Sequence, residues 1–192
     1  FMDNTAAWGG GGVFIFRTPL TISDSHFRNN LANELGGGLG YENNSTETVL
    51  ISNTTFDENI ALWNGGGIHF SGVLMTINNS TFQNNQAENG AGIHNGPPGD
   101  TRYITHPGSE IILTGSTLQE NIASRDGGGA FNEEIMTSGE CSYFANESFT
   151  LGGGVHNTGE FTSAGDTFDN NKTGFDGGGI NNYNIVEVHG ST

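Results

Sequence analysis

The residues best suited to metal binding are histidines that share one position of a repeated glycine-rich sequence. His69 follows "GGGI" and His94 follows "GAGI", each by one residue. Equivalent residues of neighbouring repeats stand about 4.8 Å apart when the repeats pair as strands, so a metal ion could bridge the two imidazoles on the outer face. Protein metal sites commonly take three or four ligands, and no third ligand recurs at this offset. The pair is therefore a weak metal candidate, and stacking of the two rings is the alternative.

Acid–base catalysis has no visible site in the sequence. Glycoside cleavage needs two carboxyl groups on neighbouring elements, but Asp126 and Asp176, which both precede glycine triplets, lie two repeats apart. The basic residues are few and occupy unrelated positions: Arg17, Arg28, Arg102, Arg125 and Lys172. We expect no catalytic residues, no enzyme activity and no cofactor.

The charge of the chain excludes other classes of function. With five Lys and Arg against 21 Asp and Glu, the net charge of −16 argues against binding nucleic acid or an anionic membrane surface. Calcium binding stays open at this charge, although the calcium nonapeptide Gly-Gly-x-Gly-x-Asp does not recur. No apolar run is long enough for a membrane span. The single cysteine, Cys141, excludes an intrachain disulfide.

Two further features could contact other molecules. The segment "GPPGDTRYITHPGSE" brings Arg102, Tyr103 and His106 together and is either a binding loop or a passive surface loop. Sequons that begin at Asn44, Asn53 and Asn79 fall at turns or in an insertion and could carry glycans.

These features are set in a repeat that begins with an apolar anchor residue. The anchors are Phe1, Phe27, Phe56, Phe82, Leu118, Tyr143 and Phe168. An asparagine stands three residues after every anchor: Asn4, Asn30, Asn59, Asn85, Asn121, Asn146 and Asn171. Because an amide both donates and accepts hydrogen bonds, stacked repeats would join these side chains in an internal structural ladder. A second, shorter column is expected from Asn95, Asn132, Asn157 and Asn182.

The residues before each anchor indicate strands. Apolar residues stand seven and five positions before it in most repeats, as Leu20 and Ile22 do before Phe27. This period of two is typical of a strand with one buried face. A unit of about 25 residues cannot bury its own apolar side, but stacked units can share a core.

The sequence therefore predicts an all-β fold, a right-handed parallel β-helix with two or three short strands in each coil. One segment over residues 1–192 would have about seven coils of about 25–27 residues. An inserted loop is expected at 96–110. The coils would start near residues 1, 27, 56, 82, 118, 143 and 168.

The motif Phe-x-x-Asn followed by Gly-Gly-(Ala/Gly)-(Ile/Leu/Val) resembles the paired repeat of the chlamydial polymorphic membrane proteins. It runs through all seven coils, with a third glycine where the chlamydial repeat prefers alanine. The resemblance implies an exported right-handed β-helix protein of the class that includes autotransporter passengers and adhesins. It implies an extracellular or cell-surface location, although a fold alone does not identify a ligand.

We expect a structural or adhesive protein, a rigid stalk or filament segment of a surface appendage. The first alternative is a pectate-lyase-like, carbohydrate-active enzyme or a carbohydrate-binding β-helix. The second is an ice-binding solenoid, suggested by outward threonines one residue before most anchors. Because the chain opens on an anchor and ends where the next would stand, the expected partners are further coils or identical subunits stacked end to end. Host or surface glycans are a further candidate partner.

Overall fold

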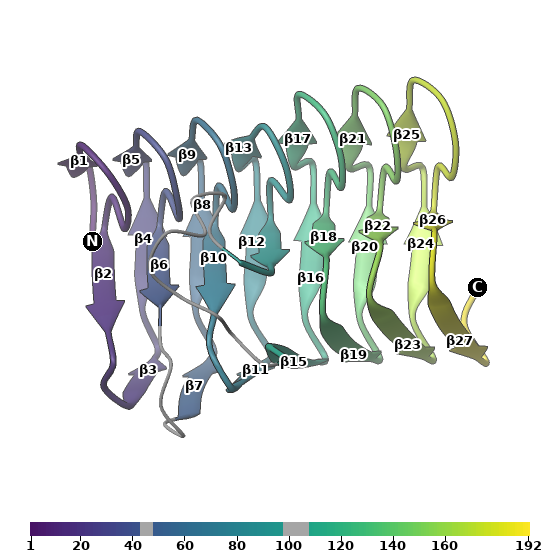
Figure 1. Cartoon of the computed structure of the whole chain (residues 1–192), viewed down its shortest axis with the longest axis horizontal. Coiled ribbons are helices and arrows are strands. Elements are labelled where there is room, and N and C mark those ends of the chain that lie inside the picture. The colour runs from purple at the N-terminus through teal and green to yellow at the C-terminus, as the bar shows by residue number, and fades with distance from the viewer. Residues whose placement is uncertain (43–47, 98–107) are drawn as a thin grey trace.

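Strands of successive repeats pair in parallel throughout the computed structural model, which describes residues 1–42, 48–97 and 108–192. The described residues contain no helix. The coils follow one another along the long axis, and the two termini lie at opposite ends (Figure 1). The chain descends through β2 (Val13–Phe16) at the front, rises through β4 (His26–Arg28) behind and advances toward the C-terminus, which makes the helix right-handed. The fold class predicted from the sequence is confirmed.

Each complete coil contributes one strand to each of four parallel sheets, which are named here in the order in which the chain visits them. The first sheet comprises β1 (Thr5–Ala6), β5 (Leu31–Ala32), β9 (Ile60–Ala61), β13 (Gln86–Ala87), β17 (Ile122–Ala123), β21 (Glu147–Ser148) and β25 (Lys172–Thr173). The second comprises β2, β6 (Leu39–Glu42), β10 (Ile68–Ser71), β14 (Ile93–Asn95), β18 (Ala130–Asn132), β22 (Val155–Asn157) and β26 (Ile180–Asn182).

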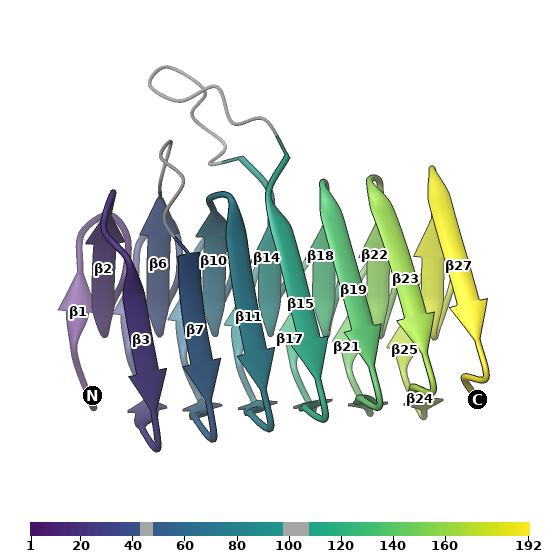
Figure 2. The ribbon, with the colours of Figure 1, turned by 90° about the horizontal axis from the view of Figure 1, so that it is seen from below.

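The other two sheets close the coil. The third, which faces the viewer in Figure 2, comprises β3 (Leu20–Ser23), β7 (Thr48–Ser52), β11 (Leu74–Asn78), β15 (Glu110–Thr114), β19 (Ile135–Gly139), β23 (Glu160–Ala164) and β27 (Ile185–His189). The fourth comprises β4, β8 (Thr55–Asp57), β12 (Thr81–Gln83), β16 (Thr117–Gln119), β20 (Ser142–Phe144) and β24 (Thr167–Asp169). The coil thus has four strands where the sequence predicted two or three, because a two-residue strand is too short to show a periodicity.

The register keeps equivalent residues of neighbouring coils in contact. Phe27, Phe56 and Phe82 are paired in the fourth sheet. Their rings stack with centroids 4.7 and 4.9 Å apart. The aliphatic residues that follow the glycines point inward from the second sheet, and residues such as Met75 and Ile77 point inward from the third. One continuous apolar core therefore runs along the axis, and most of it is shielded from water.

Glycine-rich turns form one corner of every coil, with three consecutive glycines in all but coil four, which has Gly90-Ala91-Gly92. Gly65, the first of its triplet, has φ +69°, a left-handed conformation that favours glycine. At the next position the backbones of two coils approach closely: a Cβ added to Gly66 would lie 2.5 Å from the carbonyl oxygen of Gln86. The stacking of coil three on coil four therefore leaves no room for a side chain at Gly66.

Candidate functional site

The asparagines three residues after the anchors lie in a single row along the axis. The side-chain Nδ2 of each donates to Oδ1 of the next, at 2.9–3.0 Å, from Asn4 to Asn171. The same Nδ2 also donates to the carbonyl oxygen of an anchor in the preceding coil, as Asn121 does to Phe82 at 3.0 Å. Oδ1 accepts a second hydrogen bond from a backbone N–H, as Asn121 does from Asn85 at 3.1 Å. These amides therefore satisfy the polar groups of a buried corner and offer nothing to a ligand.

A second amide row joins the ends of the second-sheet strands. Asn95, Asn132 and Asn157 each donate from Nδ2 to Oδ1 of the next asparagine, at 2.6–2.7 Å, and the row ends at Asn182. All but Asn182 are buried.

A third internal row occupies the position two residues before the anchors and was missed in the sequence. The backbone N–H of each residue donates to the side chain of the next, from Thr54 through Ser80, Ser116, Cys141 and Asp166 to Ser191. The chemical types differ, but all are small side chains that can accept a hydrogen bond. Cys141 is one member of this row: its Sγ accepts from the Ser116 N–H at 3.4 Å, and burial raises the pKa of its thiol.

His69 and His94 face outward from β10 and β14, but both are buried. Their Nδ1 atoms are 3.1 Å apart and their ring centroids 5.0 Å apart. The other ring nitrogen of His94, Nε2, lies 3.2 Å from Oε2 of Glu133. Among the described residues no group of three or more His, Cys, Asp or Glu could hold a metal ion. The two rings stack and are joined by a hydrogen bond, and Glu133 caps the pair.

A buried carboxyl group lies on the same outer side. Glu42, at the end of β6, is 3% exposed, and burial, aided by the charge of Glu34, raises its pKa to about 7. Its register partner in β10 is Ser71. Within the part of the chain that the structure describes, neither Oε1 of Glu42 nor the hydroxyl of Ser71 has a hydrogen-bond partner. An unsatisfied buried group of this kind lowers the stability of the fold when it is ionised.

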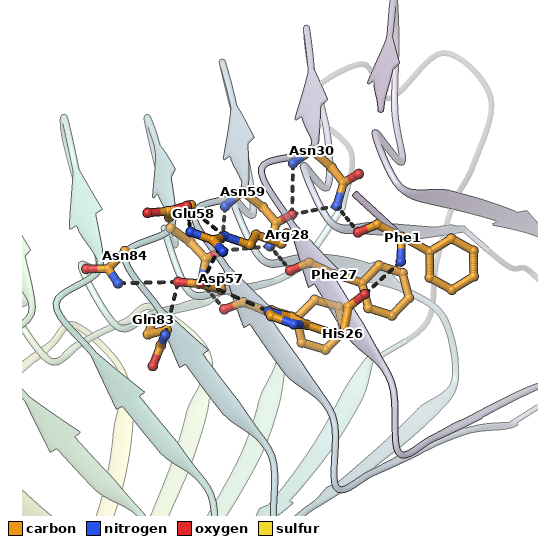
Figure 3. Close-up of polar contacts among 12 residues, drawn as sticks. Phe1, His26, Phe27, Arg28, Asn30, Asp57, Glu58, Asn59, Gln83 and Asn84 are labelled. Carbon is orange, nitrogen blue, oxygen red and sulfur yellow. Dashed lines mark hydrogen bonds and ion pairs between the residues drawn. The ribbon is translucent and has the colours of Figure 1, made fainter. Parts of the chain in front are cut away.

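A group of charged and amide side chains joined by polar contacts lies on the outer face of the fourth sheet (Figure 3). Arg28 bonds Glu58 through Nε and Nη2, both at 3.0 Å, and these contacts, aided by the charge of Asp57, raise the pKa of Arg28. Asp57 lies 3.5 Å from Arg28 Nε and accepts from Gln83 Nε2 at 3.0 Å. Gln119 donates in turn to Gln83 at 3.2 Å, which extends the outer row along the axis.

This outer row was not foreseen, because arginine, aspartate and glutamine share an offset but not a chemical type. Both carboxylates are engaged by neighbouring donors, and His26 stands 4.0 Å from Asp57. No carboxyl group of this row is paired with a second one across a free space, which is the arrangement that glycoside hydrolysis requires.

The other predicted contact residues are only partly described. Asn53 and Asn79 are exposed at corners between the third and fourth sheets, with φ +48° and +49°. Asn44 and the loop residues Arg102, Tyr103 and His106 lie outside the described residues. The outward threonine column lies on the fourth sheet, interrupted by His26 and Ser142 and mostly half-buried.

The repeat sequence is similar to sequences of known proteins. Residues 53–71 match the model of the Chlamydia polymorphic membrane protein repeat. The chain is 30% identical over 158 residues to "Probable outer membrane protein pmp20" of Chlamydia pneumoniae, which covers 72% of the chain and 9% of that protein. It is 36% identical over 85 residues to "Metabotropic glutamate receptor-like protein R" of Dictyostelium discoideum, covering 43% of the chain and 5% of that protein.

These matches confirm the resemblance to the chlamydial repeats. The chain spans less than a tenth of the length of either relative. No solved structure matches it. Among the described residues no helix is long and apolar enough to cross a membrane.

Proposed function

We propose that this chain, whose coils resemble those of the chlamydial polymorphic membrane proteins, is a rigid segment of a surface-displayed β-helix. It would act as a stalk that carries adhesive contacts on its outer faces and would have no catalysis of its own. The observation that carries the proposal is the unbroken stack of seven coils, in which the asparagine row runs from Asn4 to Asn171.

Rigidity follows from the direction of the bonds. Every strand contact in the fold joins one coil to the next, so bending the axis would stretch four parallel sheets and three internal rows of side chains together. An extended rod of this kind gains length in steps of about 4.8 Å per coil. A stalk needs such a shape, whereas a glycoside hydrolase needs a site in which two carboxyl groups converge.

The outer surface suits contact with water and partners outside the cell. The net charge of −16 keeps the rod soluble, and the amide and carboxylate row from Arg28 to Gln119 is partly exposed on the fourth sheet. The similarity to an outer membrane protein of Chlamydia pneumoniae supports display at a cell surface.

The surface location of the chain and its rod-like stack of coils can be tested separately. Antibodies raised against the chain should label intact cells of the producing organism, and protease added outside should remove the epitope. Labelling that appears only after the cells are permeabilised would refute surface display. In both cases an antibody against a cytoplasmic protein is the control for leakage.

For the stalk, removal of residues 143–167 joins Ser142 to Phe168 and deletes one coil in register. Small-angle X-ray scattering should then show a rod about 5 Å shorter with the same cross-section. An unfolded variant, or a change in cross-section, would contradict a stack of interchangeable coils.

A further inference from the structure

Coil four departs from the repeat at one corner. Gly90 follows its anchor, Phe82, by eight residues, whereas Gly65 follows Phe56 by nine. The missing residue shortens the turn that leads out of β13 in the first sheet. The turns of the neighbouring coils keep their full length, so they stand out on either side of a notch.

The notch is a shallow groove of about 220 Å³ across the first sheet. Coil three contributes Ile60 and Leu62 to one wall, and coil five contributes Ile122 and Ser124 to the other. Gln86, Ala87 and Glu88 of the shortened coil also line the groove. In Figure 1 the three strands concerned, β9, β13 and β17, lie next to one another along the upper edge of the rod.

The walls are apolar although they face water. Leu62 is 55% and Ile122 49% exposed, and Trp63, which follows Leu62, is 45% exposed. Clustered exposed apolar groups on a soluble protein commonly mark an interaction site. The volume suits one aliphatic or aromatic side chain rather than an extended ligand.

The charges around the groove are mainly negative. Glu88 lies within it and accepts a hydrogen bond from Arg125 Nη1 at 3.0 Å. Glu34 lies beside Trp63 in the corresponding turn of the preceding coil, where its carbonyl oxygen accepts a hydrogen bond from the Trp63 N–H. The chain as a whole carries −16. A partner with positive charge around an apolar anchor is therefore complementary, whereas a second copy of this chain would bring an equal negative charge.

We propose that this groove binds an apolar side chain from a positively charged polypeptide segment of another protein. The inference rests on the proposed surface function, for which it names the class of partner. A glycan fits less well, because the residues that line the groove include no aromatic ring on which a sugar could stack. The surrounding carboxylates would guide the basic residues of the segment while its apolar side chain fills the groove.

The test uses the chain and a synthetic peptide of alternating leucine and lysine as the probe. Binding should shift the methyl NMR signals of Ile60, Leu62 and Ile122, and should weaken as salt is added. Ile122→Ser, and separately insertion of one glycine between Glu88 and Asn89 to restore the turn length, should each lower the affinity about tenfold. Leu50→Ser is the matched control, because Leu50 is 42% exposed on β7 of the third sheet and does not line the groove, and this variant should bind like the unchanged chain.

Four results would overturn the proposal. They are equal weakening by Leu50→Ser, undiminished binding by both groove variants, equally tight binding of a leucine–glutamate peptide, and self-association of the chain that Ile122→Ser abolishes. The same methyl shifts with a neutral oligosaccharide would assign the groove to glycans instead. None of these results bears on surface display or rod length, so failure here and failure of the proposed function are distinguishable.

Discussion

Replacement of Asn121 tests the internal amide row at its most buried point. Asn121→Ala removes the Oδ1 that accepts from both the backbone N–H and the Nδ2 of Asn85, at 3.1 and 2.9 Å. It also removes the donor to the Phe82 carbonyl oxygen. Each buried group left without a partner costs about 1–3 kcal/mol. We expect the free energy of unfolding to fall by about 3–6 kcal/mol, a large part of the stability of an ordinary domain.

The measurement is urea denaturation followed by circular dichroism of the β-sheet signal. Repeat proteins can unfold in parts. The two free energies of unfolding can therefore be compared only if their dependence on urea concentration has the same slope in the variant and in the unchanged chain. Gln119→Ala is the matched control, because Gln119 also bonds its neighbour along the axis but lies on the outer face. The control should lose less than about 1 kcal/mol.

A nearly isosteric change separates the lost acceptor from the lost donor. Asn121→Asp keeps Oδ1 for Asn85 but, when ionised, turns a carboxylate oxygen toward the oxygens of Phe82 and Asn146. The fold then raises the pKa of the introduced carboxyl group, so the penalty is absent below its unfolded pKa and grows as pH rises. The variant should be closer to the unchanged chain at about pH 5 than at about pH 8. A loss by Asn121→Ala no greater than that of Gln119→Ala would refute the reasoning.

Three further changes follow from the structure. Ala145→Gly should raise the free energy of unfolding by about 0.5–1 kcal/mol in the same denaturation, because Ala145 has φ +51°; a loss would contradict the strain. The folded pKa of Glu42 is raised to about 7, so the free energy of unfolding of the unchanged chain should fall by about 2–3 kcal/mol as the pH rises from about 4.5 to 7. Glu42→Gln should remove this fall. A pH profile of the melting temperature that is the same in the variant and in the unchanged chain would contradict this. Cys141→Ser should change the free energy of unfolding by less than about 1 kcal/mol, because serine fills the same position of the row in other coils. In the unchanged chain, the buried thiol of Cys141 should react with a thiol reagent only when the chain unfolds.

The sequence reveals the inward half of this fold because each inward residue contacts its own equivalent. Residues at the same distance from their anchors in the sequence therefore lie next to one another in the structure. For this reason the pairing of Phe27, Phe56 and Phe82 can be predicted from their spacing alone. The row through Cys141 was missed for a related reason. One structural role there is filled by hydroxyl, thiol and carboxyl groups, so a search for a repeated residue type does not find it.

The outward half is less visible in the sequence, because its contacts join residues of different type. The bond between Arg28 and Glu58 joins two neighbouring coils, and the two residues stand at different distances from their anchors in the sequence. His69 and His94 are expected on the outer face from the sequence, but their burial could not be foreseen, since no periodic pattern specifies what covers that face. The predicted loop site at Arg102, Tyr103 and His106 stays a prediction.

A stack of near-identical coils restricts where binding specificity can reside. Inward positions are held by the internal rows and the core, so their variation is limited to side chains that make the same bond or fill the same space. An outer surface that repeated without change would offer a partner equivalent positions on successive coils and no means to choose among them. The outward residues of the first sheet already differ between coils, as Ile60, Gln86 and Ile122 do, and the shortened turn before Gly90 adds a difference in the backbone itself where Leu62 and Ile122 are exposed. A turn shorter by one residue therefore gives a partner a distinctive position along the first sheet without disturbing the coils that support it.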